Sequence, residues 1–600
     1  MKSIRYIVLS LSLLFAFTAC EDFLDVNTSK DSATTVTVDQ ALPTACFYAA
    51  QTVYDHAEYG VYLSQALTTG GKLQDGSLAY SSGWEFIKMN RHPQWRRHFY
   101  DLGANINEMI SAAEKIDSKN FILIGRTIML QSTMLTTDVF GDMPRKNAYI
   151  STSPTYDPQD SIYNWMFKEA DELIALYGNN TWVNNSTNIP ITEKMDRIYN
   201  GDMKKWGVYA KALRARLWLR KLPNMENTPA VCNKIIAMVD EVLNDPDWEE
   251  PHYNYSGGTG EQNCPWGPAA PIINSWESRG NILATSIPSK FFGYAILGAY
   301  KTNNSNRRYA LDPRAEKIMT PRKVDGSSGG LDSDGAIRFL ESNIGMGQNE
   351  KVTQYPDLYA GGTETYPNTN PYTQNTGYIA LITQEELMFI KAEAQYWAGD
   401  KAGAFNTTKE ATIYNMIRFG VTIPSATETD RHVRGRYERF FEVRLPGESE
   451  FTIAQLMQQK YVAMYLQPEQ WTDVRRYNYS SKTNGIKYDG EEVYTVRGIH
   501  KGTGTGYNLT DFTAEYSLRR PFNLYESYWM QPDAIGQNAS LSPNAWVMRL
   551  NYDPETEDKY NKAELERLGA YKNHEWLKKR MIWAYNTSNK ATSADATEWK

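Results

Sequence analysis

The strongest restriction on the fold of this chain is a helical hairpin encoded by residues 383 to 419. Apolar side chains in its first half recur at steps of three and four residues, which places them on one helix face: Leu387, Ile390, Ala394 and Trp397. Gly399-Asp400 then supplies a turn, and a second run has its own apolar face: Ala404, Phe405, Thr408, Ala411 and Met416. The pattern predicts an antiparallel helical hairpin of the tetratricopeptide type.

Helical periodicity returns in blocks over much of the chain: residues 41–67, 104–137, 161–177, 204–221, 229–243 and 451–477. Between the blocks lie long segments rich in Gly, Asn, Ser, Pro and aromatic residues: 70–95, 250–290, 320–378 and 480–515. Structureless loops of that length are uncommon in a compact domain unless they carry function. Strands are few and short, with residues 492–498 as an example. We therefore expect a mainly α fold, in which tetratricopeptide-like hairpins form a scaffold with long loops and minor β-hairpins.

The N-terminus has the features of an export signal. Lys2 and Arg5 precede an apolar run that is too short to span a bilayer, and small residues stand directly before Cys20. This arrangement predicts a lipoprotein signal whose cleavage leaves an acylated Cys20, which anchors a protein to a membrane without spanning it. The alternative is an ordinary signal peptide with an incidental cysteine. We expect a signal peptide over residues 1–19, a lipidated tether over 20–40 and one helical domain over 41–600.

Charge and cysteine content limit the classes of binding partner and the number of disulfides. Cleavage would remove Lys2 and Arg5 and no acidic residue, so the net charge would change from −7 to −9. This charge argues against nucleic acid, which is bound through clustered cations. Besides Cys20 there are three widely spaced cysteines, so at most one disulfide can form: Cys46, Cys232 and Cys264. The seven histidines are scattered, and we expect no metal site and no cofactor.

Three short motifs suggest chemistry but lack the context that the chemistry requires. Residues 326–330 spell Gly-x-Ser-x-Gly, yet a polar run precedes them where a nucleophile elbow needs an apolar strand. Asp332 and Asp334 resemble half of a calcium loop, but the remaining ligands are not in register. The Gly-Thr repeat at 502–506 continues into a polar loop and does not open a helix. We assign no catalytic residue and expect a binding protein, with a lipid-anchored hydrolase and an adhesive surface protein as rivals.

Aromatic residues are the best candidates for ligand contact. They make up 13% of the chain, with 40 Tyr and 16 Trp, which is more than a core needs. Flat rings can cover the apolar face of a pyranose, while nearby amides and guanidinium groups reach its hydroxyls. Two loop segments offer this mixture, and we predict these ligand-binding residues in them: Tyr80, Trp84, Asn90, Trp266, Trp276 and Arg279. The alternative is that such rings pack beneath the loops or contact a partner protein.

A series of motifs in fixed order resembles the SusD/RagB family of nutrient-uptake lipoproteins. The motifs are EDFLDVNTS after Cys20, LTTDVFGDMP at 135–144, the Asp-rich entry and Leu/Ala/Arg helix at 196–221, LMFIKAEAQYWAGD within the hairpin, YLQPEQWTDVRRYNY at 465–479 and RRPFNLYESYWM at 519–530. Each motif alone fits an ordinary helix. Their order and spacing over nearly the whole chain carry the resemblance.

The resemblance implies a role as well as a fold. It implies a surface lipoprotein, held in the outer membrane through acylated Cys20, that sits as a lid over a SusC-type TonB-dependent barrel transporter. The pair would capture oligosaccharides, or peptides in some members, for import. The family's ligand site also draws on the loop region after its first long helix, which adds weight to the segment with Tyr80, Trp84 and Asn90.

Overall fold

The computed structural model describes residues 37–69, 93–269, 282–284, 286–297, 312–320, 355–359, 369–428, 431–499, 514–520, 546–553 and 556–585. These residues are mainly helical, with small antiparallel sheets, which confirms the predicted fold class. The call of a single domain over 41–600 stays a prediction. Helix α3 begins at Val38, so its first turn lies within the stretch predicted as tether.

The helices of the first half are α3 Val38–Leu63, α5 Pro93–Arg96, α6 Asn105–Lys115, α7 Lys119–Phe140, α8 Gln159–Tyr177, α9 Asn180–Val183, α10 Met203–Leu219 and α11 Pro229–Leu243. Those of the second half are α12 Lys290–Leu297, α13 Ala315–Ile318, α14 Gln384–Ala398, α15 Lys401–Arg418, α16 Arg431–Arg444, α17 Ile453–Ala463, α18 Pro468–Arg476, α19 Glu557–Tyr560 and α20 Lys562–Leu568. A π-helix, η2 Arg97–Ala104, joins α5 to α6, and the short 3₁₀ helices are η3 Gly260–Gln262, η4 Ile282–Ala284, η7 Glu448–Glu450, η10 His574–Lys578 and η11 Ile582–Ala584.

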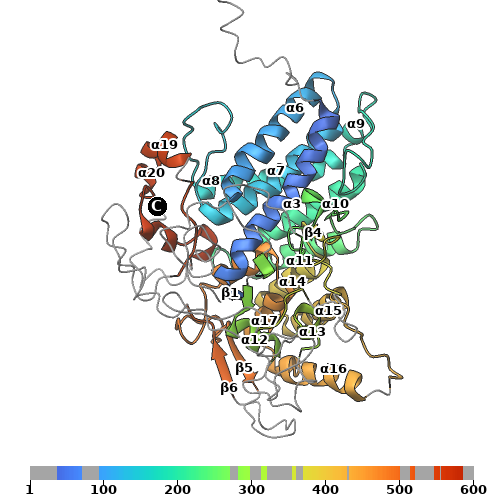
Figure 1. The fold of residues 1–600 in the computed structure, drawn as a ribbon, viewed down its shortest axis with the longest axis vertical. Helices are drawn as coiled ribbons and strands as arrows, with labels where there is room; N and C mark the ends of the chain where they lie inside the picture. Colours follow the sequence, from blue (N-terminus) through green and yellow to red (C-terminus); the bar gives the residue numbers. More distant parts are fainter. Residues whose placement is uncertain are drawn as a thin grey trace, which may run out of the picture.

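The long helices pack in a continuous series. Helix α6 packs on α7, α8 on α10, α10 on α11, α11 on α14 and α14 on α15, while α3 lies against α6, α7 and α18. Figure 1 shows the earlier helices in the upper part of the molecule, α14 to α17 below them, and α19 and α20 at the left edge. Helix-on-helix packing of this kind buries one apolar stripe from each helix.

The hairpin predicted for residues 383–419 is α14 and α15. Thr383 caps α14 by accepting a hydrogen bond from the backbone N–H of Glu386 (3.2 Å), and Asp400 caps α15 through the N–H of Gly403 (2.8 Å). Gly399 ends α14 with φ of +91°, a left-handed conformation that glycine adopts without strain. Most of the predicted face is buried, including Leu387, Ile390, Ala394, Ala404, Ala411 and Met416.

Two of the predicted helical blocks are each two helices. Block 104–137 breaks after α6, where Asp117 takes φ of +55°, and block 451–477 breaks after α17, where Leu466 takes φ of +64°. Pro468 then occupies the first turn of α18, where its missing N–H costs no hydrogen bond. The apolar period continues across both breaks, so periodicity alone did not reveal them. Helices α12 and α16 were not predicted.

The strands form three two-stranded antiparallel sheets in the part of the chain that the structure describes. Strand β1 Leu67–Thr69 pairs with β3 Ser286–Pro288, β2 His252–Asn254 with β4 Tyr378–Ala380, and β5 Thr495–Ile499 with β6 Ala514–Ser517. The strand predicted at 492–498 corresponds to β5, displaced by a few residues. These sheets close the bases of loops and do not form a core.

The last described segment returns to the middle of the molecule. The indole N–H of Trp583 donates to Asp138 of α7 (2.8 Å), and the backbone N–H of Leu550 donates to the carbonyl of Val139 (2.9 Å). Asn224 donates to the carbonyl of Trp583 (3.1 Å). Trp583 is fully buried, so the C-terminal segment completes the core. Cys46, Cys232 and Cys264 are all free and buried.

Two glycines allow a matched test of the hairpin. Gly399→Ala is expected to lower the free energy of unfolding by about 1 kcal/mol, because a Cβ strains the left-handed cap. Gly435→Ala, within helix α16 and with nothing within 4 Å of an added Cβ, is expected to raise it by about 0.5–1 kcal/mol. Urea unfolding followed by far-UV circular dichroism measures both. Equal effects of the two substitutions would contradict the helix–turn–helix boundary at Gly399.

Candidate functional site

Most of the predicted site lies outside the described residues. This holds for Cys20, Tyr80, Trp84, Asn90, Trp276 and Arg279. The structure does describe the points at which the chain enters and leaves the two ligand-binding segments. These attachment points define the position of the candidate site on the helical scaffold.

A single small sheet holds one end of each segment. Thr69, the last residue of β1, pairs with Ser286, the first residue of β3. The segment that carries Tyr80 and Trp84 begins directly after Thr69, and the segment that carries Trp276 ends directly before η4. Segments more than 180 residues apart in the chain are thus attached at the same place.

Side-chain hydrogen bonds fix this sheet to the helical scaffold. The Tyr62 hydroxyl lies 2.5 Å from the Ser286 hydroxyl, and the Tyr461 hydroxyl of α17 donates to the carbonyl of Ser64 (3.0 Å). The Ser64 hydroxyl donates to Gln470 of α18 (3.0 Å). All five side chains are buried, so α3, α17 and α18 together set the position of the β1–β3 base. Because packed helices fix the position of this base, the points at which the two segments are attached stay at a constant distance from one another.

Trp266 is the one predicted site residue that the structure describes, and it lies in the core. Its side chain is 1% exposed, and its ring meets Tyr54 of α3 edge to face with centroids 4.7 Å apart. Its loop is held by hydrogen bonds from the backbone N–H of Cys264 to the carbonyl of Asn375 (2.9 Å) and from that of Ala269 to the Asn375 side chain (2.8 Å). In this position Trp266 supports the start of the segment with Trp276 and offers no open ring face to a ligand.

Trp95, which follows the segment with Trp84, also lies in the core. Its side chain is 1% exposed, and its ring centroid lies 4.6 Å from that of Phe99 and 5.1 Å from that of Phe140. Its indole N–H donates a hydrogen bond to Glu557 (3.1 Å). Tyr372, in the aromatic-rich segment 320–378, is equally buried. The alternative reading, in which loop rings pack beneath the loops, therefore holds for Trp95, Trp266 and Tyr372.

Comparison with known proteins fits this architecture. Residues 32–264 match a SusD-like family model described as "Starch-binding associating with outer membrane". No match was found among curated proteins. A SusD/RagB family protein from Bacteroides thetaiotaomicron superposes with a TM-score of 0.60 at 16% identity, over 92% of this chain and 100% of that one.

Two further structures agree. A SusD homologue from Parabacteroides distasonis has a TM-score of 0.55 at 18% identity, and a chitin-binding SusD homologue from Flavobacterium johnsoniae has 0.54 at 14%; each comparison covers 92% of this chain and 99% of the other. At these identities the likeness establishes the fold, and the family model adds sequence agreement over the N-terminal part. The chain therefore has the SusD-like fold, and residues 32–264 resemble the SusD-like family in sequence.

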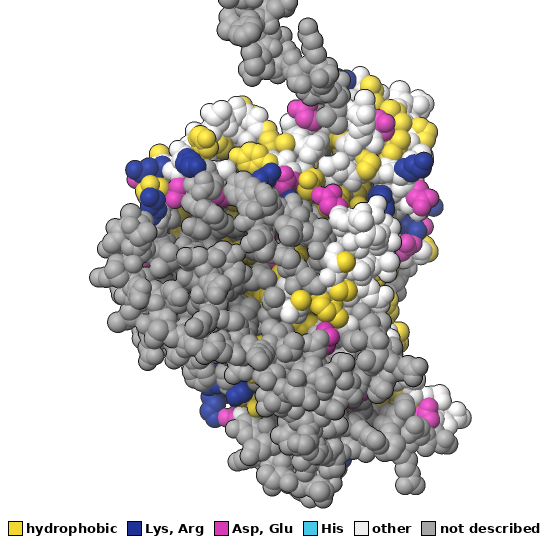
Figure 2. All heavy atoms as spheres, in the orientation of Figure 1, with side chains coloured by type: hydrophobic (Ala, Val, Ile, Leu, Met, Phe, Trp, Pro, Cys, Tyr) yellow, Lys and Arg dark blue, Asp and Glu magenta, His cyan; other side chains and the backbone are white. Residues whose placement is uncertain are grey.

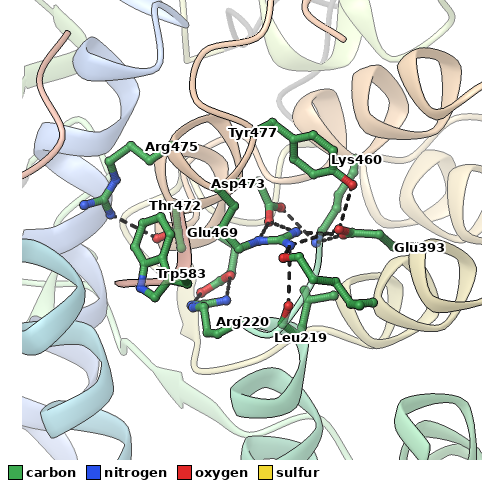
Figure 3. Close-up of polar contacts among 12 residues, drawn as sticks. Leu219, Arg220, Glu393, Lys460, Glu469, Thr472, Asp473, Arg475, Tyr477 and Trp583 are labelled. Carbon is green, nitrogen blue, oxygen red and sulfur yellow. Dashed lines mark hydrogen bonds and ion pairs between the residues drawn. The ribbon is translucent and has the colours of Figure 1, made fainter. Parts of the chain in front are cut away.

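Four of the motifs that carry the resemblance to SusD/RagB proteins meet in a buried charge network, shown in Figure 3. Arg220 at the end of α10 donates to Glu469 of α18 (2.6 and 2.8 Å) and to Asp138 of α7 (3.0 and 3.1 Å). Arg476 of α18 donates to Glu393 of α14 (2.7 and 2.9 Å). The network therefore joins α7, α10, α14 and α18.

The network is balanced in charge. It contains five acidic and five basic side chains, each at most 3% exposed: Asp138, Glu386, Glu393, Glu469 and Asp473 against Arg216, Arg220, Lys460, Arg475 and Arg476. Burial alone would raise the pKa of Glu469, but the guanidinium groups of Arg220 and Arg216 hold it well below its ordinary value. Every carboxylate of the network is engaged by a cation and closed to solvent. The network is thus suited to fixing helices and has no access for a substrate.

Two histidines are buried among the helices. His56 of α3 meets Trp471 edge to face (5.8 Å), and His98 of η2 lies 2.8 Å from the Ser132 hydroxyl. Burial lowers the pKa of each to about 3, so both are neutral in the folded protein at neutral pH. Across the described ranges, no group of three or more His, Cys, Asp or Glu side chains is placed to hold a metal ion.

Removal of one charge from the network tests its structural weight. Glu469→Gln is expected to lower the free energy of unfolding by about 3–5 kcal/mol, because Arg220 and Arg216 would stay buried with less negative charge around them. Glu226→Gln, which removes the partner of the half-buried Lys221, is the control and should cost about 0–1 kcal/mol. Urea unfolding measures both. A Glu469→Gln protein as stable as the control would refute the role given to the network.

The buried histidines predict a pH dependence of stability. His56 and His98 bind a proton with a pKa near 6.5 when unfolded and only near pH 3 when folded, so the unfolded state takes up more protons as the pH falls below about 6.5. The free energy of unfolding should fall by about 1.4 kcal/mol per pH unit for each fully titrating histidine. Urea unfolding at pH 6, 5.5 and 5 measures the slope, and His98→Gln should reduce it. An unchanged slope in that variant would contradict the neutral state of His98.

Proposed function

We propose that this chain is a surface-exposed outer-membrane lipoprotein that binds nutrient oligomers, glycans in particular, and delivers them to a SusC-type TonB-dependent transporter. The proposal includes no catalysis. Three findings support it: the SusD-like fold over 92% of the chain, a family model described as starch-binding, and a chitin-binding protein among the structural neighbours. A polymer-binding lid needs modest affinity and easy release, and shallow ring stacking provides both.

The observation that carries the proposal is the shared base of the two ring-bearing segments. The β1–β3 sheet attaches the segment with Tyr80, Trp84 and Asn90 beside the segment with Trp276 and Arg279. Rings and hydrogen-bonding groups attached at one rigid base can act on a single ligand. We assign these five residues to ligand binding and Trp266 to the support beneath them.

Membrane attachment is proposed to run through acylated Cys20. None of the helices in the described part of the chain is long and apolar enough to span a bilayer. An acyl anchor on a tether that ends at α3 would keep the helical domain beside the membrane. The transporter then provides the route across it.

Two alternatives differ in ligand or in chemistry. A peptide-binding member of the same family would use the same fold, and its ligand would be held by backbone hydrogen bonds as well as by rings. A lipid-anchored hydrolase would need an open pair of catalytic groups. The fully buried carboxylates of the charge network do not offer such a pair, because arginine and lysine side chains already occupy them.

Calorimetric titration of the mature chain against starch, chitin and other glycan oligomers and against peptides tests the proposal. A glycan class is expected to bind, and Trp84→Ala and Trp276→Ala are each expected to weaken binding by more than about 1 kcal/mol through loss of a stacking ring. Trp218→Ala is the matched control, since Trp218 lies half-buried on α10 beside Lys234 and away from the β1–β3 base.

The outcomes separate the alternatives. Binding of peptides without glycans would replace the ligand and keep the site. Turnover of a labelled polysaccharide or peptide by the pure protein would support the hydrolase. If Trp218→Ala weakens glycan binding as much as Trp84→Ala does, the proposed site is wrong.

A further inference from the structure

Exposed apolar side chains are concentrated on one part of the surface. The large apolar residues exposed among those the structure describes are Tyr100, Ile116, Tyr149, Ile150, Ile189, Ile417 and Tyr560. All except Ile417 of α15 belong to η2, α19 and the turns of the upper helices, and we call these six residues the apolar rim. Figure 2 shows hydrophobic side chains along this upper edge, over the α7–α8 loop and around α9. Exposed apolar side chains gathered in contiguous patches mark contact surfaces, and the rim contains two such groups.

Two residues of the rim lie at the turn between α6 and α7 and in the loop that is hydrogen-bonded to it. Ile116 in that turn is 45% exposed, and Ile189 in the loop after α9 is 37% exposed. Hydrogen bonds hold the two together: the N–H of Ile189 donates to the Ser118 hydroxyl (2.9 Å), and Asn120 donates to the carbonyl of Ile189 (2.8 Å). Two aliphatic side chains are thus presented to solvent by a fixed turn.

Three more residues of the rim lie on the α7–α8 loop and on helix α19, which is hydrogen-bonded to that loop. Ile150 is 82% and Tyr149 is 42% exposed, and the Tyr149 hydroxyl lies 3.5 Å from the carbonyl of His98 in η2. Tyr560 is 66% exposed, and its carbonyl accepts a hydrogen bond from Ser153 of the same loop (2.9 Å). Hydrogen bonds between segments therefore fix this group as well.

Two of the loops that carry the rim contain stretches without a charged residue. Residues 147–155 and 178–192 consist of Asn, Ser, Thr, Gly, Ala and Pro with Tyr149, Ile150, Trp182, Val183, Ile189 and Ile191, although 22% of the whole chain is charged. Amphipathic rings, aliphatic side chains and neutral hydrogen-bonding groups are suited to the interfacial zone of a bilayer. Ile116 lies between Lys115 and Asp117, whose charged ends would stay at the polar edge of that zone.

The rim lies at the end of the molecule where the tether joins the fold. Helix α3 ends at β1 in the middle of the molecule, so its first turn lies at the top, beside the α6–α7 turn (Figure 1). The chain between Cys20 and Thr37 reaches at most about 60 Å when fully extended. A membrane anchor at Cys20 therefore limits the distance of this end of the domain from the lipid to about 60 Å at most.

We propose that the apolar rim rests on the lipid bilayer, with Ile116, Ile150 and Ile189 in the interfacial zone, so that the helical bundle stands on the membrane in a fixed orientation. This inference rests on the proposed anchoring through Cys20. A glycan is a poorer fit for the rim, because branched aliphatic side chains have no flat face to stack on a sugar ring. Lipid contact adds a second, weak attachment to the acyl chains.

Cysteine labelling on the lipidated full-length protein tests the proposal. The native thiols give little background, since Cys46, Cys232 and Cys264 are buried and burial raises the pKa of Cys232 to about 11 and of Cys264 to about 12. Ile150→Cys and Ile116→Cys report on the rim, and Ile417→Cys is the matched control at an exposed isoleucine elsewhere. Each variant is reconstituted into vesicles of phosphatidylethanolamine and phosphatidylglycerol without any other protein. Its reaction with a membrane-impermeant maleimide is compared with that of the same chain carrying Cys20→Ala, which has neither the acyl anchor nor a thiol at that position, in buffer.

Labelling at positions 116 and 150 is expected to be slower in vesicles by about tenfold, with position 417 unchanged. Equal rates at all three positions in protein that is attached to vesicles would overturn the rim contact alone. Failure to attach to vesicles would overturn the Cys20 anchor together with the rim contact, and glycan titration would stay unaffected. Protection on whole cells that is absent from vesicles would show that a protein covers the rim, which also overturns the proposal.

Discussion

Five acidic and five basic side chains lie together in the interior of this SusD-like protein, and the arrangement of the helices depends on them. An isolated buried charge is costly, so each of the five carboxylates must find one of the five cations at hydrogen-bonding distance. The members come from α7, α10, α14, α17 and α18, which are far apart in sequence. Apolar stripes allow helices to slide against each other at small cost, whereas a two-point contact such as Arg220 with Glu469 permits a single register.

The same network lies in the sequence motifs that resemble the SusD/RagB family. Asp138 lies in the motif at 135–144, Arg220 in that at 196–221, Glu393 in the hairpin, and Glu469 and Arg476 in the motif at 465–479. These positions share a physical requirement, since a change at one leaves a buried charge at another. Solved structures at 14–18% identity share the fold of this chain.

The helical scaffold could be predicted from the sequence, but the contacts between residues far apart in the chain could not. Periodicity identified the long helices because each buries one face, but it ran through Asp117 and Leu466, where positive φ angles end helices without disturbing the apolar pattern. The pairing of Arg220 with two carboxylates joins residues up to 249 positions apart, which no local pattern reports. For the site, composition could not separate a ring that supports a loop from one that faces a ligand. Trp266 packs on Tyr54 because a backbone hydrogen bond to Asn375 holds its loop against the core. Asn375 lies more than 100 residues further along the chain.

The bond from Trp583 to Asp138 links nearly the last part of the chain to the charge network. Synthesis of the chain runs from the N-terminus, so Asp138 is made long before Trp583. Until residue 583 follows, the Asp138 oxygen that accepts from Trp583 has the Tyr163 hydroxyl as a donor but not the indole N–H. The helices can form before that point, but the core is filled only when the C-terminal segment is present. A chain that stops short of residue 583 therefore keeps a space at the centre of its core, where the fully buried indole belongs.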